Sequence, residues 1–423
     1  MQSVRRPTVS ARRTILSALS VACLVTPAMA TSVDWGQTYF DGGRTGANTR
    51  ETVLSASNVA NLQLDWSRSF PGDVRALVVN DHYVVARVPG GPHKKMQLWY
   101  LNYSTGETVW HIDVGPDVPA ANGTLATGDR RIFTGCGLVD KVGYKYSGIC
   151  AYLKTNGKKV WQFSNPCDCL TEANVVTPLD WGIHVIFFGY FNGGSEGKEY
   201  VLAADTMTGA ILGSYQTGGP GSLGTAPIAW GLDKVYFDCG GSICALVRQG
   251  NFAWKANVGA PIGGLTADKY HRIFASLCNG PAGLVALDDA AGAPLWSYGP
   301  SQCNQTPPAV TADRVYLTAA DGAVHALDAS TGAEIWSAGS GNVSAPSYAN
   351  GVVYVAGGSH APAASAYDAN TGVLLWSTPA HSSKYHLPPM VIDGRLYVAN
   401  AACGGICAFK LPDGAKRSAP RTN

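Results

Sequence analysis

The sequence predicts an all-β fold: an eight-bladed β-propeller of four-stranded antiparallel blades, closed by an N-terminal strand that completes the C-terminal blade. Three observations predict it. The first is an eleven-residue phrase that recurs along the 423-residue chain and reads ALDASTGAEIW at 326–336 and AYDANTGVLLW at 366–376. The second is its recurrence about every 40–50 residues among short strands, which is typical of propeller blades. The third is that the first and last copies are incomplete in complementary ways.

Each copy of the phrase predicts two strands joined by a tight turn. Apolar residues alternate on both sides of Asp-x-x-Thr-Gly, as in half-buried strands. The Asp can accept hydrogen bonds from the turn backbone, and the Gly tolerates a positive φ. The final Trp would wedge between blades, because one blade cannot bury both of its faces. The blade-docking residues are expected to be Trp66, Trp110, Trp161, Trp254, Trp296, Trp336 and Trp376, while Gly213 and Ser418 occupy two further slots.

The two ends of the repeat array complement each other. Residues 62–67 supply an outer strand with its Trp but no strand before it. Residues 388–393, 395–399 and 406–411 supply three strands with no Trp strand after them. Joining them gives one composite blade and seven complete ones, and removes sheet edges that would otherwise be exposed. If residues 62–67 packed elsewhere, seven blades would be the better interpretation.

The first thirty residues resemble a secretory signal peptide. Arginines at 5, 6, 12 and 13 form a basic start, residues 15–25 an apolar core, and Ala28-Met29-Ala30 a small-residue cleavage site. We expect export by a Sec-type or a twin-arginine signal, the latter because of Arg12-Arg13, and a periplasmic or secreted protein. Lipidation at Cys23 is not expected, because Ser20 stands where Leu is usual. We expect residues 31–423 to be a single propeller domain, with 31–60 as an N-terminal lead-in and 412–423 as a flexible tail.

Composition narrows the partner classes. The net charge is +2 and 14% of residues are charged, which gives no basic stripe for nucleic acid. No stretch after the signal reaches the roughly 20 apolar residues that span a bilayer. The 50 Gly and 24 Pro suit a chain of many short strands and turns. We expect a monomer with no transmembrane segment.

The cysteines predict disulfides. Of 11 cysteines, ten follow Cys23, an even number in an exported chain. Metal binding is the alternative, but the chain has no Cys-x-x-Cys pair and no haem motif. Several cysteines bracket probable turns between adjacent strands. The expected pairs are Cys136 with Cys150, Cys167 with Cys169, Cys239 with Cys244, Cys278 with Cys303, and Cys403 with Cys407.

The phrase resembles the docking motif of the pyrroloquinoline-quinone (PQQ) propeller family, Ala-x-Asp-x-x-Thr-Gly-x-x-x-Trp. The resemblance covers nearly the whole mature chain, including the opening segment Trp35-Gly36-Gln37 with residues 41–48. It implies an eight-bladed propeller. The family divides into quinoprotein dehydrogenases, which bind PQQ and calcium, and non-catalytic scaffolds such as the propeller lipoprotein of the outer-membrane β-barrel assembly machine. Because the motif serves blade packing in both branches, function must be argued from the funnel.

The dehydrogenase branch would need a quinone pocket, oxygen ligands for calcium, a base and a cation. In larger alcohol dehydrogenases of the family, adjacent cysteines form the pocket ceiling, and this chain has no adjacent pair. Cys167-Asp168-Cys169 is the nearest equivalent. Under this alternative the resemblance implies Glu172 and Asn174 as calcium ligands and Arg75 or Lys384 as the cation. Otherwise the cysteines pin a rim loop and the polar residues face solvent, so we expect no cofactor.

Other clusters carry less chemistry. His381 and His386 flank one rim loop, and a metal site there would need a partner such as His325 or His360. We expect these histidines to be solvated. The chain has no Gly-x-Ser-x-Gly, no His-Glu-x-x-His and no phosphate-binding glycine loop. No catalytic or metal-binding residue is therefore assigned.

These observations favour an exported binding or scaffold protein that docks a protein or envelope partner at its rim or funnel, rather than an enzyme. The alternative is a compact quinoprotein alcohol or sugar dehydrogenase dependent on PQQ and calcium. A third, less favoured hypothesis is a propeller hydrolase or lyase that acts on a polysaccharide through rim His, Tyr and Arg side chains.

Overall fold

The computed structural model describes residues 35–413, apart from short stretches. Val33–Asn423 form one compact unit. The predicted signal peptide, residues 1–30, and residues 414–423 of the predicted tail lie outside the described residues. The internal stretches left out are 81, 91–94, 117–124, 129, 140–144, 165–176, 181–183, 193–197, 219–227, 248–250, 279–281, 300–305, 340, 359, 382–385 and 402.

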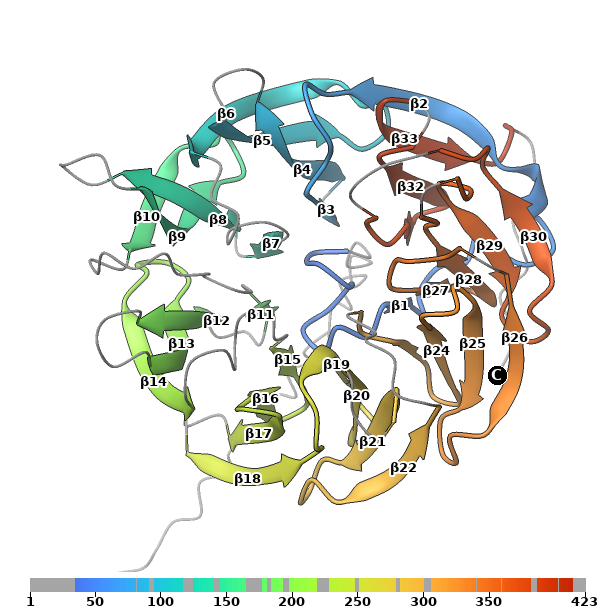
Figure 1. Cartoon of the computed structure of the whole chain (residues 1–423). Coiled ribbons are helices and arrows are strands. Elements are labelled where there is room, and N and C mark those ends of the chain that lie inside the picture. Colours follow the sequence, from blue (N-terminus) through green and yellow to red (C-terminus); the bar gives the residue numbers. More distant parts are fainter. Residues whose placement is uncertain are drawn as a thin grey trace, which may run out of the picture. The chain divides into compact units, whose positions relative to one another are not determined.

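Eight antiparallel sheets are arranged around a common centre (Figure 1), which confirms the predicted eight-bladed propeller. We number the blades along the chain. Blade 1 is β3 (Ala76–Asn80), β4 (Tyr83–Gly90), β5 (Lys95–Asn102) and β6 (Thr108–Pro116). Blade 2 is β7 (Leu125–Gly128), β8 (Arg131–Val139), β9 (Lys145–Leu153) and β10 (Lys159–Ser164). Blade 3 is β11 (Thr177–Asp180), β12 (His184–Asn192), β13 (Lys198–Asp205) and β14 (Ile211–Gly218). Blade 4 is β15 (Ala229–Trp230), β16 (Lys234–Asp238), β17 (Ser242–Val247) and β18 (Phe252–Asn257).

The second half of the ring repeats this order. Blade 5 is β19 (Ile262–Ala267), β20 (Arg272–Leu277), β21 (Leu284–Asp288) and β22 (Pro294–Tyr298). Blade 6 is β23 (Ala309–Val310), β24 (Arg314–Thr318), β25 (Val324–Asp328) and β26 (Glu334–Ala338). Blade 7 is β27 (Ser347–Ala349), β28 (Val352–Val355), β29 (Ser365–Asp368) and β30 (Leu374–Ser377), with β1 (Ala47–Asn48) added parallel to β27. Blade 8 is β31 (Met390–Ile392), β32 (Arg395–Ala399), β33 (Gly405–Lys410) and β2 (Gln63–Ser69), and η1 (Val59–Asn61) precedes β2. No helix among these residues is long and apolar enough to cross a membrane.

Blade 8 joins the two ends of the chain. β2 pairs antiparallel with β33, and Trp66 lies opposite Ala408. The predicted closure by residues 62–67 is therefore confirmed. Asp65 adds an ion-pair clasp that the repeat pattern did not reveal, because it lies 3.1 Å from Arg395 Nε and 3.2 Å from Lys410 Nζ.

The repeated turn works through its own side chains. In blade 6, Asp328 Oδ1 accepts hydrogen bonds from the backbone N–H of Ser330 (3.0 Å) and of Thr331 (2.9 Å). Hydrogen bonds from the hydroxyls and backbone of these two residues lower the pKa of Asp328 to about 2. Gly332 then takes φ +72°, where a Cβ would lie 2.5 Å from the ring of Trp296 in the preceding blade. The glycine is needed both for its φ and for this close approach.

Each docking Trp joins two blades. The indole N–H donates to the first carbonyl of the next blade's turn, and the ring lies against the glycine of that turn. Both features recur at six seams. The N–H bonds run from Trp66 to Tyr103, Trp110 to Lys154, Trp161 to Thr206, Trp254 to Asp289, Trp296 to Ala329 and Trp336 to Ala369, at 2.8–3.1 Å. Trp376 instead packs edge-on against Phe409 of blade 8, with ring centroids 5.1 Å apart.

The seam between blades 3 and 4 departs from this pattern. Gly213 occupies the Trp slot, and an added Cβ there would meet nothing within 4 Å. Nearer the centre, Phe187 of blade 3 stacks on Trp230 of blade 4 at 5.7 Å. Tyr215 packs against Phe237 at 5.6 Å. Aromatic side chains from inner and outer strands thus fill this seam in place of the docking Trp.

Candidate binding face

Consecutive antiparallel strands divide the loops of the ring between two ends. We call hairpin face the end that carries the connections between the second and third strands of each blade and those between blades. We call turn face the opposite end, which carries the first-to-second connections and the Asp-x-x-Thr-Gly turns. This follows because strand direction reverses at every step within a blade.

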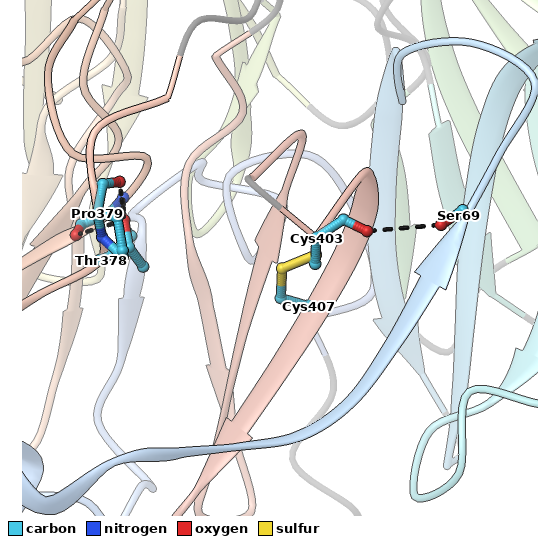
Figure 2. Close-up of a disulfide and its surroundings, with 6 residues drawn as sticks. Ser69, Thr378, Pro379, Cys403 and Cys407 are labelled. Carbon is cyan, nitrogen blue, oxygen red and sulfur yellow. Dashed lines mark hydrogen bonds between the residues drawn. A yellow bond between two sulfur atoms is a disulfide. The ribbon is translucent and has the colours of Figure 1, made fainter.

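Disulfides gather on the hairpin face. Cys136–Cys150 joins β8 to β9, with Cα atoms 5.8 Å apart, and Cys239–Cys244 closes the β16–β17 hairpin at 5.9 Å. Cys403–Cys407 closes the β32–β33 hairpin at 6.1 Å. Figure 2 shows this last bridge and the contact, 3.5 Å, between the Cys403 carbonyl oxygen and the Ser69 hydroxyl of β2.

The other predicted pairs are only partly visible. Cys278, at the end of β20, is disulfide-bonded and lies on the same kind of connection in blade 5. Its predicted partner Cys303 lies outside the described residues, as do Cys167 and Cys169. The pairs 278–303 and 167–169 therefore stay predictions. Bridged second-to-third connections thus occur in blades 2, 4 and 8, and that of blade 5 carries a disulfide-bonded cysteine.

Hydrogen bonds tie these hairpins to the segments that lead into the next blade. Asn400 of blade 8 accepts from Val74 N (2.7 Å) and donates to Val74 O (2.9 Å), ahead of blade 1. Ser276 of blade 5 donates to Thr306 O at 2.8 Å, ahead of blade 6. Asn342, ahead of blade 7, donates through its side chain to the Gly322 carbonyl of blade 6 at 3.1 Å. The described part of the hairpin face is therefore a cross-braced rim at the seams between blades 8 and 1, 5 and 6, and 6 and 7.

Residues 35–48, which we call the girdle, lie at the turn-face end of the centre of the ring. Its backbone bonds in order to the inner strands of blades 1, 2, 4, 5, 6 and 7, and Asn48 reaches blade 8 through Val391 O at 2.8 Å. Figure 1 shows this blue segment and β1 inside the ring of sheets. The bonded pairs are Trp35 with Val79, Gly36 with Thr127, Gly42 with Trp230, Gly43 with Ala267, Thr45 with Val310 and Gly46 with Tyr348. Chain backbone thus occupies that end, and we expect partners to approach from the hairpin face.

The predicted site residues are not assembled by the described part of the chain. Glu172, Asn174 and Lys384 lie outside the described residues. Arg75 is half-buried just before β3, where its backbone N–H donates to Arg87 O at 2.8 Å. Of the four residues proposed to bind a quinone and calcium, the structure therefore describes only Arg75. No catalytic step is derived from them.

The histidines lie in separate settings. His325, 9% exposed, sits 3.2 Å from carboxylate oxygens of both Asp321 and Glu334. His360 is exposed, and burial lowers the pKa of His386. His381 donates its backbone N–H to Ala361 O at 3.0 Å. Within the described residues, no group of three or more His, Cys, Asp or Glu side chains could hold a metal ion.

A buried polar cluster at the seam between blades 4 and 5 was not predicted. Asp289, 3% exposed, bonds to Lys234 Nζ at 3.1 Å, to His271 Nδ1 at 3.0 Å and to the Tyr236 hydroxyl. Burial raises the pKa of Asp289, but these hydrogen bonds outweigh it and hold the net pKa below its usual value. Asp289 occupies the position after the turn Asp, where the two cleanest copies have Ala329 and Ala369, so the repeat pattern did not indicate an acidic residue there.

The fold and the braced rim define a closed β-propeller with a preformed hairpin face. Its repeats belong to a known family. Residues 14–174, 240–347 and 322–417 match the family described as outer membrane protein assembly factor BamB, and the chain is a member of this PQQ-like repeat family. No curated protein matches the sequence.

Solved structures share the fold at low identity. The quinohaemoprotein alcohol dehydrogenase ADHIIG of Pseudomonas putida HK5 is 15% identical, with a TM-score of 0.65 over 93% of this chain and 82% of its own. A europium-containing methanol dehydrogenase is 15% identical, with a TM-score of 0.65 over 86% of this chain and 89% of its own. BamB of Moraxella catarrhalis is 17% identical, with a TM-score of 0.56 over 82% of this chain and 99% of its own. At such identity these similarities concern the fold alone.

Proposed function

We propose that this protein is an exported binding or scaffold protein that docks a protein partner of the cell envelope on its hairpin face. The observation that carries the proposal is the cross-braced rim. Disulfide-bonded cysteines in four blades and hydrogen bonds between successive blades brace the described part of this face. Loops held by a rigid scaffold lose little entropy on binding, which favours recognition.

Two further points support the proposal. The family is described as outer membrane protein assembly factor BamB, a description that names a role in assembly. The girdle occupies the turn-face end of the centre, so the hairpin face is the open approach. We also propose that residues 1–30 direct export and are removed, which fits the disulfides, since these persist in oxidising compartments.

The alternative is a compact quinoprotein dehydrogenase. It is favoured by the fold shared with a quinohaemoprotein alcohol dehydrogenase over 93% of this chain. Under it, Glu172 and Asn174 would bind calcium, and Arg75 or Lys384 would face the quinone. When bound, PQQ would accept the electrons of the alcohol.

Reconstitution separates the two functions. Purified protein is incubated with PQQ and Ca²⁺, then assayed for quinone absorbance and for dye reduction with alcohols and sugars. The binding function predicts no turnover. Stoichiometric PQQ with turnover that is lost in Glu172→Gln would replace it with the dehydrogenase function.

The docking face is tested with two matched valines. Val343 is 43% exposed on the connection into blade 7, and Val373 is 59% exposed after the blade 7 turn, on the turn face. In cross-linking of envelope extracts, Val343→Asp should lower recovery of a saturable partner at least tenfold, while Val373→Asp leaves it unchanged. Equal recovery with both variants, or loss only with Val373→Asp, would place the partner elsewhere.

A further inference from the structure

Arg44 is a buried cation without an ionic partner in the described structure. Its residue is 8% exposed, and its guanidinium carbon lies 4.6 Å from the centre of the Tyr39 ring. Nε and Nη1 have no hydrogen-bond partner. Since a guanidinium has five N–H donors, three of them are unsatisfied.

The nearest acid in the girdle is used elsewhere. Asp41 accepts hydrogen bonds from Thr45 N at 2.9 Å and from Thr45 Oγ1 at 2.7 Å, one on each carboxylate oxygen. Within the described ranges, no carboxylate lies within ion-pair distance of Arg44. Burial accordingly lowers the pKa of Arg44. Buried charges in proteins are normally paired, so this arginine calls for a counter-ion.

The backbone keeps Arg44 in place. Thr266 Oγ1 donates to Arg44 O at 3.2 Å, and the flanking carbonyls of Gly43 and Thr45 each accept at 2.8 Å from Ala267 and Val310. Arg44 itself has φ +58°, which a non-glycine residue adopts only when its surroundings impose it. The Cα of Arg44 is therefore held in place, and the backbone of residues 43–45 is not free to carry the side chain out to solvent.

We propose that Arg44 forms an anion-binding site in the girdle that takes a small organic carboxylate. A planar carboxylate matches the planar guanidinium donors. One monoanion neutralises one cation, whereas a phosphate dianion would leave a buried negative charge. The Tyr39 ring lies against the guanidinium and borders the site. This inference goes beyond the proposed function and does not depend on it, since the girdle is not part of the hairpin face.

Thermal unfolding of the full mature chain tests the site. Sodium acetate, benzoate or phosphate is titrated at constant ionic strength, balanced with sodium fluoride. The wild type should show a saturable rise in Tm with acetate or benzoate, about 3 °C at a hundredfold excess over Kd, and a smaller one with phosphate. Arg44→Met should lose the rise, and Arg50→Met, at an exposed arginine of the same segment, should keep it.

The outcomes are decisive in each direction. No carboxylate-specific rise in the wild type, or an equal rise in Arg44→Met, would overturn the site. If Arg44→Met does not fold, titration of the wild type with ¹³C-acetate decides instead. Saturable line broadening that benzoate displaces supports the site, and its absence refutes it. Failure here leaves the partner-docking result unaffected, because that result depends on Val343, which lies on the opposite face from the girdle.

Discussion

Trp66 lies at the seam where the two ends of the chain close the ring. It is 8% exposed on β2, and its indole N–H donates to Tyr103 O of blade 1 at 3.0 Å. Its ring lies against Gly106, where an added Cβ would be 2.5 Å away, and 6.0 Å from the Tyr397 ring. Trp66→Ala therefore removes a side chain shared by the first and last blades.

Trp66→Ala loses a hydrogen bond and leaves a cavity, and the structure indicates which of the two costs more free energy of unfolding. The Tyr103 carbonyl keeps a second donor, the Tyr397 hydroxyl at 3.0 Å, so the lost hydrogen bond costs at most about 1 kcal/mol. Truncating a large buried aromatic leaves a cavity and costs about 3–5 kcal/mol. The cavity is thus the larger part, and Trp66→Phe should recover more than half of the loss. For a chain of this length, the full loss corresponds to a Tm lower by about 4–6 °C.

The assay is thermal and urea unfolding followed by far-ultraviolet circular dichroism. Leu64 is the matched control, because it lies on the same strand but is 55% exposed. Leu64→Ala should change the free energy of unfolding by about 0.5 kcal/mol or less. If Trp66→Ala costs no more than Leu64→Ala, the reasoning on closure is refuted.

Three further outcomes are expected. Gly332→Ala should cost about 1–2 kcal/mol or more, since Gly332 has φ +72° and a crowded Cβ position, while Gly213→Ala should cost little because its Cβ position is open; equal melting temperatures would contradict this. Because the pKa of Asp289 is lowered in the fold, its stabilisation is full above the unfolded value of about 3.9 and is lost as pH falls through the folded value. The difference in free energy of unfolding between wild type and Asp289→Asn should therefore shrink below about pH 4, and a pH-independent difference would disprove the linkage. Deleting residues 31–70 should leave the β33 edge unpaired and cause aggregation on size-exclusion chromatography, whereas a soluble monomer would show that closure is dispensable.

Much of the fold could be predicted from the sequence because the same turn motif recurs in successive blades. The Asp-x-x-Thr-Gly-x-x-x-Trp spacing encodes a turn closed by its own Asp and Gly, and a Trp that reaches the next turn. Asp328 acts as the pattern predicts because the N–H groups that it accepts from lie two and three residues away, and Gly332 takes the positive φ expected in the same turn. Closure by the strand that carries Trp66 was predictable for a different reason. The repeat array begins with an outer strand that has no blade and ends with a blade that has no outer strand, so the first can complete the second.

Features outside the repeat could not be predicted in this way. The seam at Gly213 is filled by Phe187, Trp230 and Tyr215, which lie on different strands of two blades and share no spacing rule. The bracing pair Asn400 and Val74 is separated by most of the chain.

The sequence by itself determined the number of blades, the turn chemistry, three disulfide pairings seen in the structure and the joining of the two ends, because these are local or complementary patterns. The tertiary structure alone decided where the girdle runs and that Arg44 is buried without a counter-ion. The girdle meets six blades through backbone hydrogen bonds and a seventh through the Asn48 side chain. Almost any residue can make the backbone bonds, so the path of the girdle leaves little trace in residue type. Burial is likewise a property of the assembled ring, since no neighbour of Arg44 in sequence reveals which inner strands close around it.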